Sequence, residues 1–228
     1  MIGSTMWKNI LIAGGTGRTG QIIVNNLIAQ GIHPHLIVRD AAKAVALFGE
    51  RAAVHEADIS EIETLLPALQ GMDAVISALG TRTPVGKNCP KHVDYQGIAN
   101  LIRAAHIAAV KRFVLISSIA VTHPEHPLNR FGHVLEWKLK SEQVLRESGL
   151  DYAIIRPGGL TDAPGSRQIL LFGQGDTISG TLSRANLAEI CLAALAYPAP
   201  ARVTFEAIES DQTGRRDWTK LFALLTPD

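Results

Sequence analysis

The chain has 228 residues, of which 46% are hydrophobic and 19% are charged, and its formal net charge is +1. This balance is typical of a globular domain, and the near-neutral charge argues against nucleic acid or an anionic membrane surface as the main partner. The apolar runs have the length of strands and are too short to span a bilayer, so no membrane partner is expected.

The first residues, MIGSTMWKN, lack the pattern of a secretory signal, and an extension added before Met6 is one interpretation of them. The two cysteines, Cys89 and Cys191, lie far apart and predict no disulfide framework. Both features are typical of a cytoplasmic protein.

Apolar, strand-like runs alternate along the chain with segments of helical periodicity. We expect strands at 8–13, 34–38, 53–57, 73–78, 112–117 and 151–155, and shorter ones at 168–172 and 202–207. Helices are expected at 21–29, 92–109, 133–148 and 183–196, with a final helix from 215. The alternation predicts an α/β fold, a Rossmann-like doubly wound parallel sheet with helices on both faces. We expect one domain, in which a small C-terminal region from about 157 covers the substrate.

The first expected strand runs into the glycine-rich stretch GGTGRTG, which opens the first helix. In this context the pattern predicts a cradle for a dinucleotide pyrophosphate, with an ordinary strand–helix turn as the alternative. Glycine permits a tight turn and close approach of the phosphate, and the helix N-terminus offers N–H groups. The expected cofactor contacts in this stretch are Gly14, Thr16, Gly17, Arg18, Thr19 and Gly20.

The second expected strand ends in LIVRD, which places Arg39 where an NAD-binding protein usually offers a carboxylate to the ribose. A guanidinium suits a 2′-phosphate, and Arg18 and Lys43 would add positive charge. The sequence therefore favours NADP(H) over NAD as the cofactor. Two alternatives stay open: the carboxylate of Asp40 would suit a ribose hydroxyl, and Arg39 would be an ordinary solvated cation.

With VRD, EADI, ISALGTRTP, KRFVLISS, LRESGLDYAIIRPG and LSRANLAEI, these features resemble the atypical short-chain dehydrogenase/reductases. The similarity covers nearly the whole chain and points to the NAD(P)-binding branch with NmrA-like proteins and biliverdin-IXβ/flavin reductases. It implies cofactor contacts at Asp58 and Ile59 (adenine), at Leu79, Gly80 and Thr81 (adenosine and pyrophosphate), and at Pro157 and Gly158 (nicotinamide). The alternatives are a helix cap for Asp58 and plain turn residues for Pro157 and Gly158.

Short-chain dehydrogenases usually place a tyrosine four residues before a lysine on one helix, where the tyrosine donates a proton. Aligned onto this chain, the motif puts the lysine at Lys138, a glutamate at Glu142 and a valine, Val134, at the tyrosine position. Valine cannot donate a proton. Lys138 is a candidate catalytic residue and ribose contact, and the alternative is a solvated lysine that pairs with Glu142.

Ser118 is the second candidate catalytic residue. It ends the expected strand 112–117 and matches a serine of the flavin and biliverdin reductases. Its hydroxyl can donate to a substrate carbonyl, and the alternative is a strand-end serine bonded to the backbone.

The loop VTHPEHPLNRFGH brings three histidines near the expected substrate edge. Two prolines beside His123 and His126 deny the spacing of a zinc site, so no metal is expected. His133 is a weaker candidate for a general acid. We expect loops 81–92, 119–133 and 159–180 to line the acceptor pocket.

The missing tyrosine disfavours reduction of a simple ketone, because the alkoxide that forms needs a proton. Flavins, quinones and linear tetrapyrroles accept hydride while solvent supplies the proton. The sequence therefore predicts an NADPH-dependent oxidoreductase that acts on a planar, conjugated small molecule. Two alternatives stay open: a non-catalytic NmrA-like sensor of NADP(H) with a protein partner, and a lysine-dependent enzyme resembling isoflavone reductases, with Lys138 as proton donor.

Overall fold

An eight-stranded sheet runs through the middle of the protein in a computed structural model that describes residues 7–165, 168–197 and 201–228. The strand order is β3-β2-β1-β4-β5-β6-β10-β8, and neighbours are parallel except β10 and β8. The strands are β1 Ile10–Ala13, β2 His35–Val38, β3 Ala53–Glu56, β4 Ala74–Ser77, β5 Arg112–Ile116, β6 Asp151–Pro157, β8 Gln168–Gly173 and β10 Val203–Thr213. A separate parallel pair joins β7 Gly159–Thr161 to β9 Thr181–Ser183. The segment before Met6 and residues 166–167 of one expected pocket wall lie outside the described residues.

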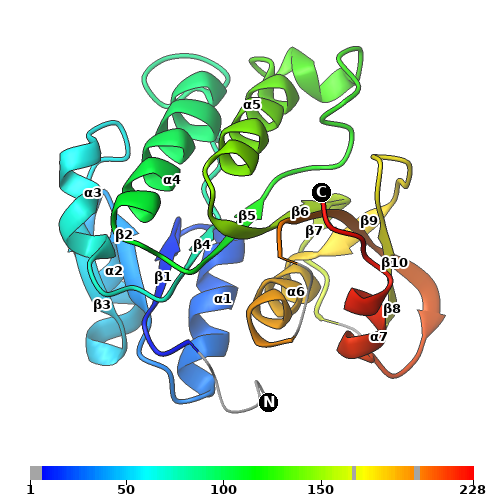
Figure 1. The fold of residues 1–228 in the computed structure, drawn as a ribbon, viewed down its shortest axis with the longest axis horizontal. Coiled ribbons are helices and arrows are strands. Elements are labelled where there is room, and N and C mark those ends of the chain that lie inside the picture. The colour runs from blue at the N-terminus through cyan, green and yellow to red at the C-terminus, as the bar shows by residue number, and fades with distance from the viewer. Residues whose placement is uncertain (1–6, 166–167, 198–200) are drawn as a thin grey trace.

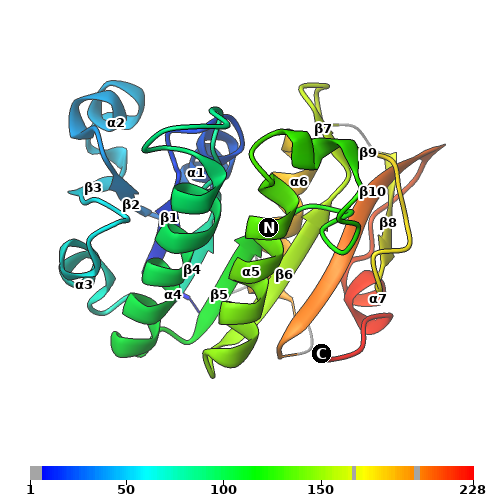
Figure 2. The same ribbon diagram turned by 90° about the horizontal axis from the view of Figure 1, so that it is seen from above.

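Helices cover both faces of the sheet (Figures 1 and 2). One face carries α1 Arg18–Ala29, α2 Ala41–Phe48, α6 Arg184–Ala196 and α7 Trp218–Ala223. The other carries α3 Ile62–Leu69, α4 Ile98–Ile107 and α5 Val134–Glu147. Short 3₁₀ turns lie at Gly49–Arg51 (η1) and Pro127–Arg130 (η3), and a π-helical turn, η2, spans Lys91–Gly97.

Residues along each strand alternate between two hydrophobic layers. Ile10 and Ile12 of β1 pack into the layer beneath α1 and α6, and Leu11 and Ala13 pack into the layer beneath α4 and α5. Because both faces of the sheet are buried, the central strands are continuous apolar runs. The expected doubly wound α/β fold is therefore confirmed.

Several expected boundaries are wrong. The expected helix 92–109 is the π-helical turn η2 followed by α4, and α1 begins at Arg18 rather than at residue 21. The expected helix from 215 begins only at Trp218, because β10 continues to Thr213 and Asp217 caps α7 by accepting from the Lys220 N–H. Residues after 157 supply β8 and β10 to the main sheet, and covering of a substrate by this region stays a prediction.

A buried ionic cluster fastens α5 to the sheet. The fully buried Glu142 accepts from the Arg156 Nε and Nη2 atoms at 3.0 and 2.7 Å, from Arg146 at 3.0 Å and from the Ser117 hydroxyl at 2.5 Å. Burial alone would lower the pKa of Arg156, but the bonds and charge of Glu142 raise it. The alternative in which Lys138 pairs with Glu142 is wrong, because the Lys138 ammonium pairs with Asp94 instead.

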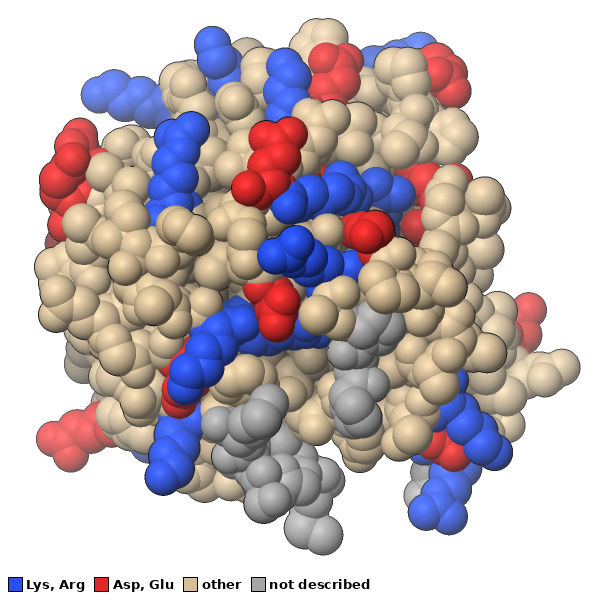
Figure 3. Space-filling view, viewed as in Figure 1, with Lys and Arg blue, Asp and Glu red and all other residues tan. Residues whose placement is uncertain are grey.

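Charges of both signs are mixed on the surface. Figure 3 shows Lys and Arg side chains next to Asp and Glu across this face, without one broad area of a single sign. Among the described residues, no helix is long and apolar enough to cross a membrane. The absence of a nucleic-acid or membrane partner stays a prediction.

Replacing Glu142 by glutamine should lower the free energy of unfolding by about 3–5 kcal/mol, because Arg156 and Arg146 lose their shared charged acceptor and Arg156 keeps the more distant Glu206 at 3.7 Å. Urea unfolding followed by circular dichroism measures the change. Glu136→Gln is the matched control on the same helix, because that carboxylate is 43% exposed and, among the residues that the structure describes, forms an ion pair with His133 alone. Its effect should stay below about 1 kcal/mol. Equal effects of the two substitutions would contradict the role given to the buried cluster.

Candidate functional site

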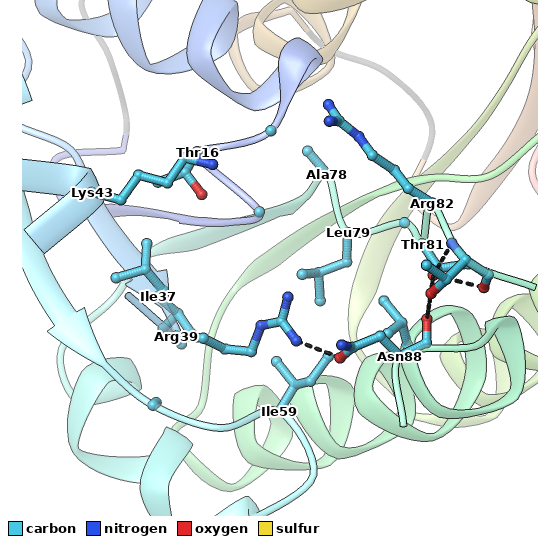
Figure 4. A pocket seen from close by; sticks show the side chains of 17 residues that line it. Thr16, Ile37, Arg39, Lys43, Ile59, Ala78, Leu79, Thr81, Arg82 and Asn88 are labelled. Atoms are coloured by element: carbon cyan, nitrogen blue, oxygen red, sulfur yellow. Dashed lines mark hydrogen bonds between the residues drawn. The ribbon is translucent and has the colours of Figure 1, made fainter. Parts of the chain in front are cut away.

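A cleft of about 350 Å³ opens at the carboxyl ends of β1, β2 and β4, where the strand order of the sheet reverses. Ligands bind at this switch point in open α/β sheets. The expected cofactor contacts that line the cleft are Gly14, Thr16, Gly17, Arg39, Ile59, Leu79, Gly80 and Thr81, which Figure 4 draws together. The structure thus brings together residues from four separate parts of the sequence.

The glycine turn is so tightly packed that side chains would not fit. Gly14 has a φ of +82°, and a Cβ there would lie 2.6 Å from the carbonyl oxygen of Ala78. A Cβ at Gly20 would overlap the carbonyl oxygen of Gly14. The turn is closed by a hydrogen bond from the Gly17 N–H to the Gly14 oxygen at 2.9 Å. At Gly14 and Gly17, a ligand in the cleft would meet main chain rather than side chains, which suits a pyrophosphate.

The first turn of α1 offers N–H groups to such a ligand. Gly17 is the N-cap residue and provides no side-chain cap, so the amides of Arg18, Thr19 and Gly20 lack a capping partner. The Arg18 side chain points elsewhere: it pairs with Asp162, which also pairs with Arg184 at 2.8 Å. This corrects the expectation that Arg18 adds charge beside Arg39, and a main-chain contact of Arg18 and Thr19 with the cofactor stays a prediction.

Three cations, Arg39, Lys43 and Arg82, line the cleft, and no carboxylate lies among its described lining residues. Arg39 donates from Nη1 to the side-chain oxygen of Asn88, which faces it in Figure 4. Within the described residues, none of the three cations forms an ion pair. The cleft is therefore positively charged and suits an anionic group.

Asp40 caps a helix and does not take the ribose-binding role that its position suggested. Its side chain accepts from the Lys43 N–H at 2.9 Å and caps α2. Because Asp40 does not line the cleft, the structure does not support it as a ribose ligand.

Asp58 and Ile59 lie in different surroundings in the structure. Asp58 accepts from the N–H and hydroxyl of Ser60 at 2.8 and 2.7 Å, and these bonds lower the pKa of Asp58. It forms a turn and does not cap α3, whose N-cap residue is Glu61, so the capping alternative is wrong. Ile59 lines the cleft and Asp58 does not, and an adenine contact of Asp58 stays a prediction.

Lys138 lies within α5 one turn after Val134, as the aligned motif expects. Its Nζ atom pairs at 2.9 Å with Asp94, whose side chain is 1% exposed, while that of Lys138 is 14% exposed. Lys138 is therefore neither a solvated surface lysine nor a partner of Glu142. The sequence did not single out Asp94, because its partner is far away in the chain.

The two serines after β5 differ in their bonding. The Ser117 hydroxyl donates a hydrogen bond to Glu142, whereas the hydroxyl of Ser118 forms no hydrogen bond within the described residues. The backbone-bonded alternative for Ser118 is thus not what the structure shows. Ser118 is partly buried and remains the candidate donor to a substrate.

Two expected pocket walls are joined by Asp176, which the sequence did not indicate. Its carboxylate accepts from the Ala120 N–H at 2.6 Å and from the Thr122 N–H and hydroxyl at 2.9 and 2.8 Å. Burial would raise the pKa of Asp176, but these bonds lower it. The loop after β5 and the loop after β8 are therefore held together at the carboxyl edge of the sheet.

The turn after β6 is also closely packed. β6 ends at Pro157, the Gly158 N–H donates to the Ala207 oxygen at 2.9 Å, and a Cβ at Gly158 would lie 2.5 Å from the Gly180 oxygen. Neither Pro157 nor Gly158 lines the described cleft, so their place beside a nicotinamide stays a prediction.

The histidines of the loop after β5 have local partners. His123 contacts the main-chain oxygen of Asp176 at 3.3 Å, and His126 accepts from the Leu128 N–H. His133 forms a hydrogen bond with the Glu136 carboxylate at 2.9 Å. No group of three His, Cys, Asp or Glu side chains in the described parts of the chain could hold a metal ion.

Comparison with known proteins identifies the family of this chain. Residues 14–198 match the model of the NAD(P)H-binding family. Sanguinarine reductase from Eschscholzia californica is 30% identical over 99% of this chain and 97% of its own length. Among solved structures, a protein described as an NAD-dependent epimerase/dehydratase from Bacillus halodurans superimposes with a TM-score of 0.80, at 25% identity over 96% of this chain and 100% of the other. ChuY, an anaerobillin reductase from Escherichia coli O157:H7, gives a TM-score of 0.76, at 25% identity over 91% of this chain and 100% of the other. The chain therefore belongs to the NAD(P)H-binding family, among the atypical short-chain dehydrogenase/reductases.

Proposed function

We propose that this oxidoreductase of the NAD(P)H-binding family uses NADPH to reduce a planar, conjugated acceptor such as a flavin, a quinone or a tetrapyrrole. The observation that carries the proposal is Val134, an apolar residue one turn before Lys138 on α5, where dehydrogenases of this superfamily carry the proton-donating tyrosine. When bound, the cofactor supplies the hydride. An acceptor that spreads the resulting negative charge over a conjugated system takes its proton from water and needs no acid from the protein.

The residues of the cleft support NADP(H) as the cofactor. The tight glycine turn and the first amides of α1 would hold the pyrophosphate, because only bare main chain fits there. Arg39, Lys43 and Arg82 would hold a 2′-phosphate, and Asp40 is already engaged as the cap of α2. A site built for NAD usually presents a carboxylate at this place.

The acceptor would lie at the carboxyl edge between the loops that Asp176 joins. Ser118, whose hydroxyl is not engaged by the described residues, is the candidate donor to a carbonyl of the acceptor. The names of sanguinarine reductase and of ChuY agree with a reductase. A cytoplasmic location stays a prediction from the two cysteines, both of which are free thiols.

Purified protein should oxidise NADPH in the presence of a quinone or FMN and leave cyclohexanone, a simple ketone, unreduced. The physical reason is the missing acid, which only the simple ketone requires. The loss of absorbance at the nicotinamide band measures both reactions. Tight NADP binding without turnover of a broad acceptor panel would contradict the reductase and favour the sensor, and rapid ketone reduction would contradict the role given to Val134.

Replacing Arg39 by alanine should weaken NADP binding by about 10- to 100-fold, because a charged hydrogen-bond donor to the 2′-phosphate is lost. The affinity for NAD should change by less than about twofold, since NAD lacks that phosphate. Isothermal titration calorimetry with both dinucleotides measures the preference. Arg103→Ala removes an exposed arginine outside the cleft and serves as control. An unchanged preference in the Arg39 variant would show that Arg39 does not read the phosphate.

A further inference from the structure

A rare helical turn approaches three of the expected cofactor-binding segments. Residues Lys91–Gly97 form the π-helical turn η2, which continues directly into α4. Turns of this kind are uncommon and are frequent at functional sites. A Cβ at Gly97 would overlap the side chain of Ile59, so glycine allows Ile59 to pack against the turn. The turn therefore packs against Ile59, which lines the cleft.

The centre of this turn is a buried carboxylate with two partners. Asp94 is fully buried, its Oδ1 atom lies 2.9 Å from Lys138 Nζ, and its Oδ2 atom accepts from the Thr81 N–H at 3.2 Å. A Cβ on Gly80 would lie only 3.7 Å from the same carboxylate. One side chain thus connects helix α5 to the segment that follows β4.

The charges of this pair depend on each other. A carboxylate or an ammonium that is removed from water is stable only with a partner of opposite charge, so loss of either leaves the other uncompensated. Lys138 has three N–H donors, and its contact with Asp94 is an ion pair without hydrogen-bond geometry. The pair therefore fixes the position of the ammonium and leaves donors for a second ligand.

We propose that Asp94 is a positioning residue that sets two ends of the cofactor site at once. It places the Lys138 ammonium, and it holds the Leu79–Thr81 segment that lines the cleft. The inference rests on the proposed function, because the ligand that both elements would contact is NADP(H). Asp94 itself does not line the cleft and acts through Lys138 and the Thr81 amide.

The test compares NADP affinity of the full-length wild type, Asp94→Asn, Lys138→Met and the double variant by isothermal titration calorimetry. Asp94→Asn should weaken binding about tenfold or more, as expected for lost charged hydrogen bonds. The double variant should bind no more weakly than Asp94→Asn, because the two residues act as one unit. An NADP affinity of Asp94→Asn equal to that of the wild type would overturn the inference. So would a double variant whose loss of affinity is the product of the losses in the two single variants.

Asp73→Asn is the matched control. It removes the carboxylate of another Asp–Lys pair, with Lys111 at 3.0 Å, which lies just before β4 at the opposite edge of the sheet. Its NADP affinity should equal that of the wild type. A loss as large as that of Asp94→Asn would mean that any broken surface pair weakens binding, and the specific role of Asp94 would be refuted.

Hydrogen–deuterium exchange separates this inference from the cofactor proposal. Without cofactor, Lys138→Met should raise exchange in residues 79–83, since Asp94 loses the partner that holds it against the Thr81 amide, while exchange in β2 should not change. This measurement also stands if Asp94→Asn fails to fold. Unchanged exchange in 79–83 would overturn the inference, whereas a wild type that binds no NADP would overturn the proposed function alone.

Discussion

Close approach of main chain to main chain at the glycine turn is the constraint on which the site depends. A Cβ on Gly14 would lie 2.6 Å from the carbonyl oxygen of Ala78, just after β4, and a Cβ on Gly20 in α1 would overlap the Gly14 carbonyl, so no side chain fits at either position. This packing aims the first amides of α1 at the point where the sheet order reverses. It also puts Leu79, Gly80 and Thr81 on the opposite side of the same cleft, so the other parts of the site are placed by it.

Charge is distributed unevenly between the interior and the cleft. In the interior, Arg156 and Arg146 pair with Glu142, and Lys138 pairs with Asp94. The cations of the cleft form no ion pair within the described residues, and Arg39 donates to the neutral amide of Asn88. An anion that enters the cleft therefore gains charged hydrogen bonds without breaking an ion pair.

The parts of the fold and site that depend on neighbouring residues could be predicted from the sequence. The strands, the glycine turn and Arg39 at the end of β2 follow from local periodicity and spacing. Asn88, Asp94 and Asp176 could not be found in this way, because their partners Arg39, Lys138 and Thr122 lie far from them in the chain. The π-helical turn has the same apolar spacing as an ordinary helix, and the late start of α7 depends on the pairing of β10 with β8.

The most direct test of the account is a crystal structure of the protein with NADP⁺ and a bound flavin or quinone. The account predicts the 2′-phosphate on Arg39, the pyrophosphate at the first turn of α1, and a planar acceptor with no ionisable side chain at its reacting atom. A 2′-phosphate that turns away from Arg39, or a protein acid in contact with the reacting atom, would contradict it.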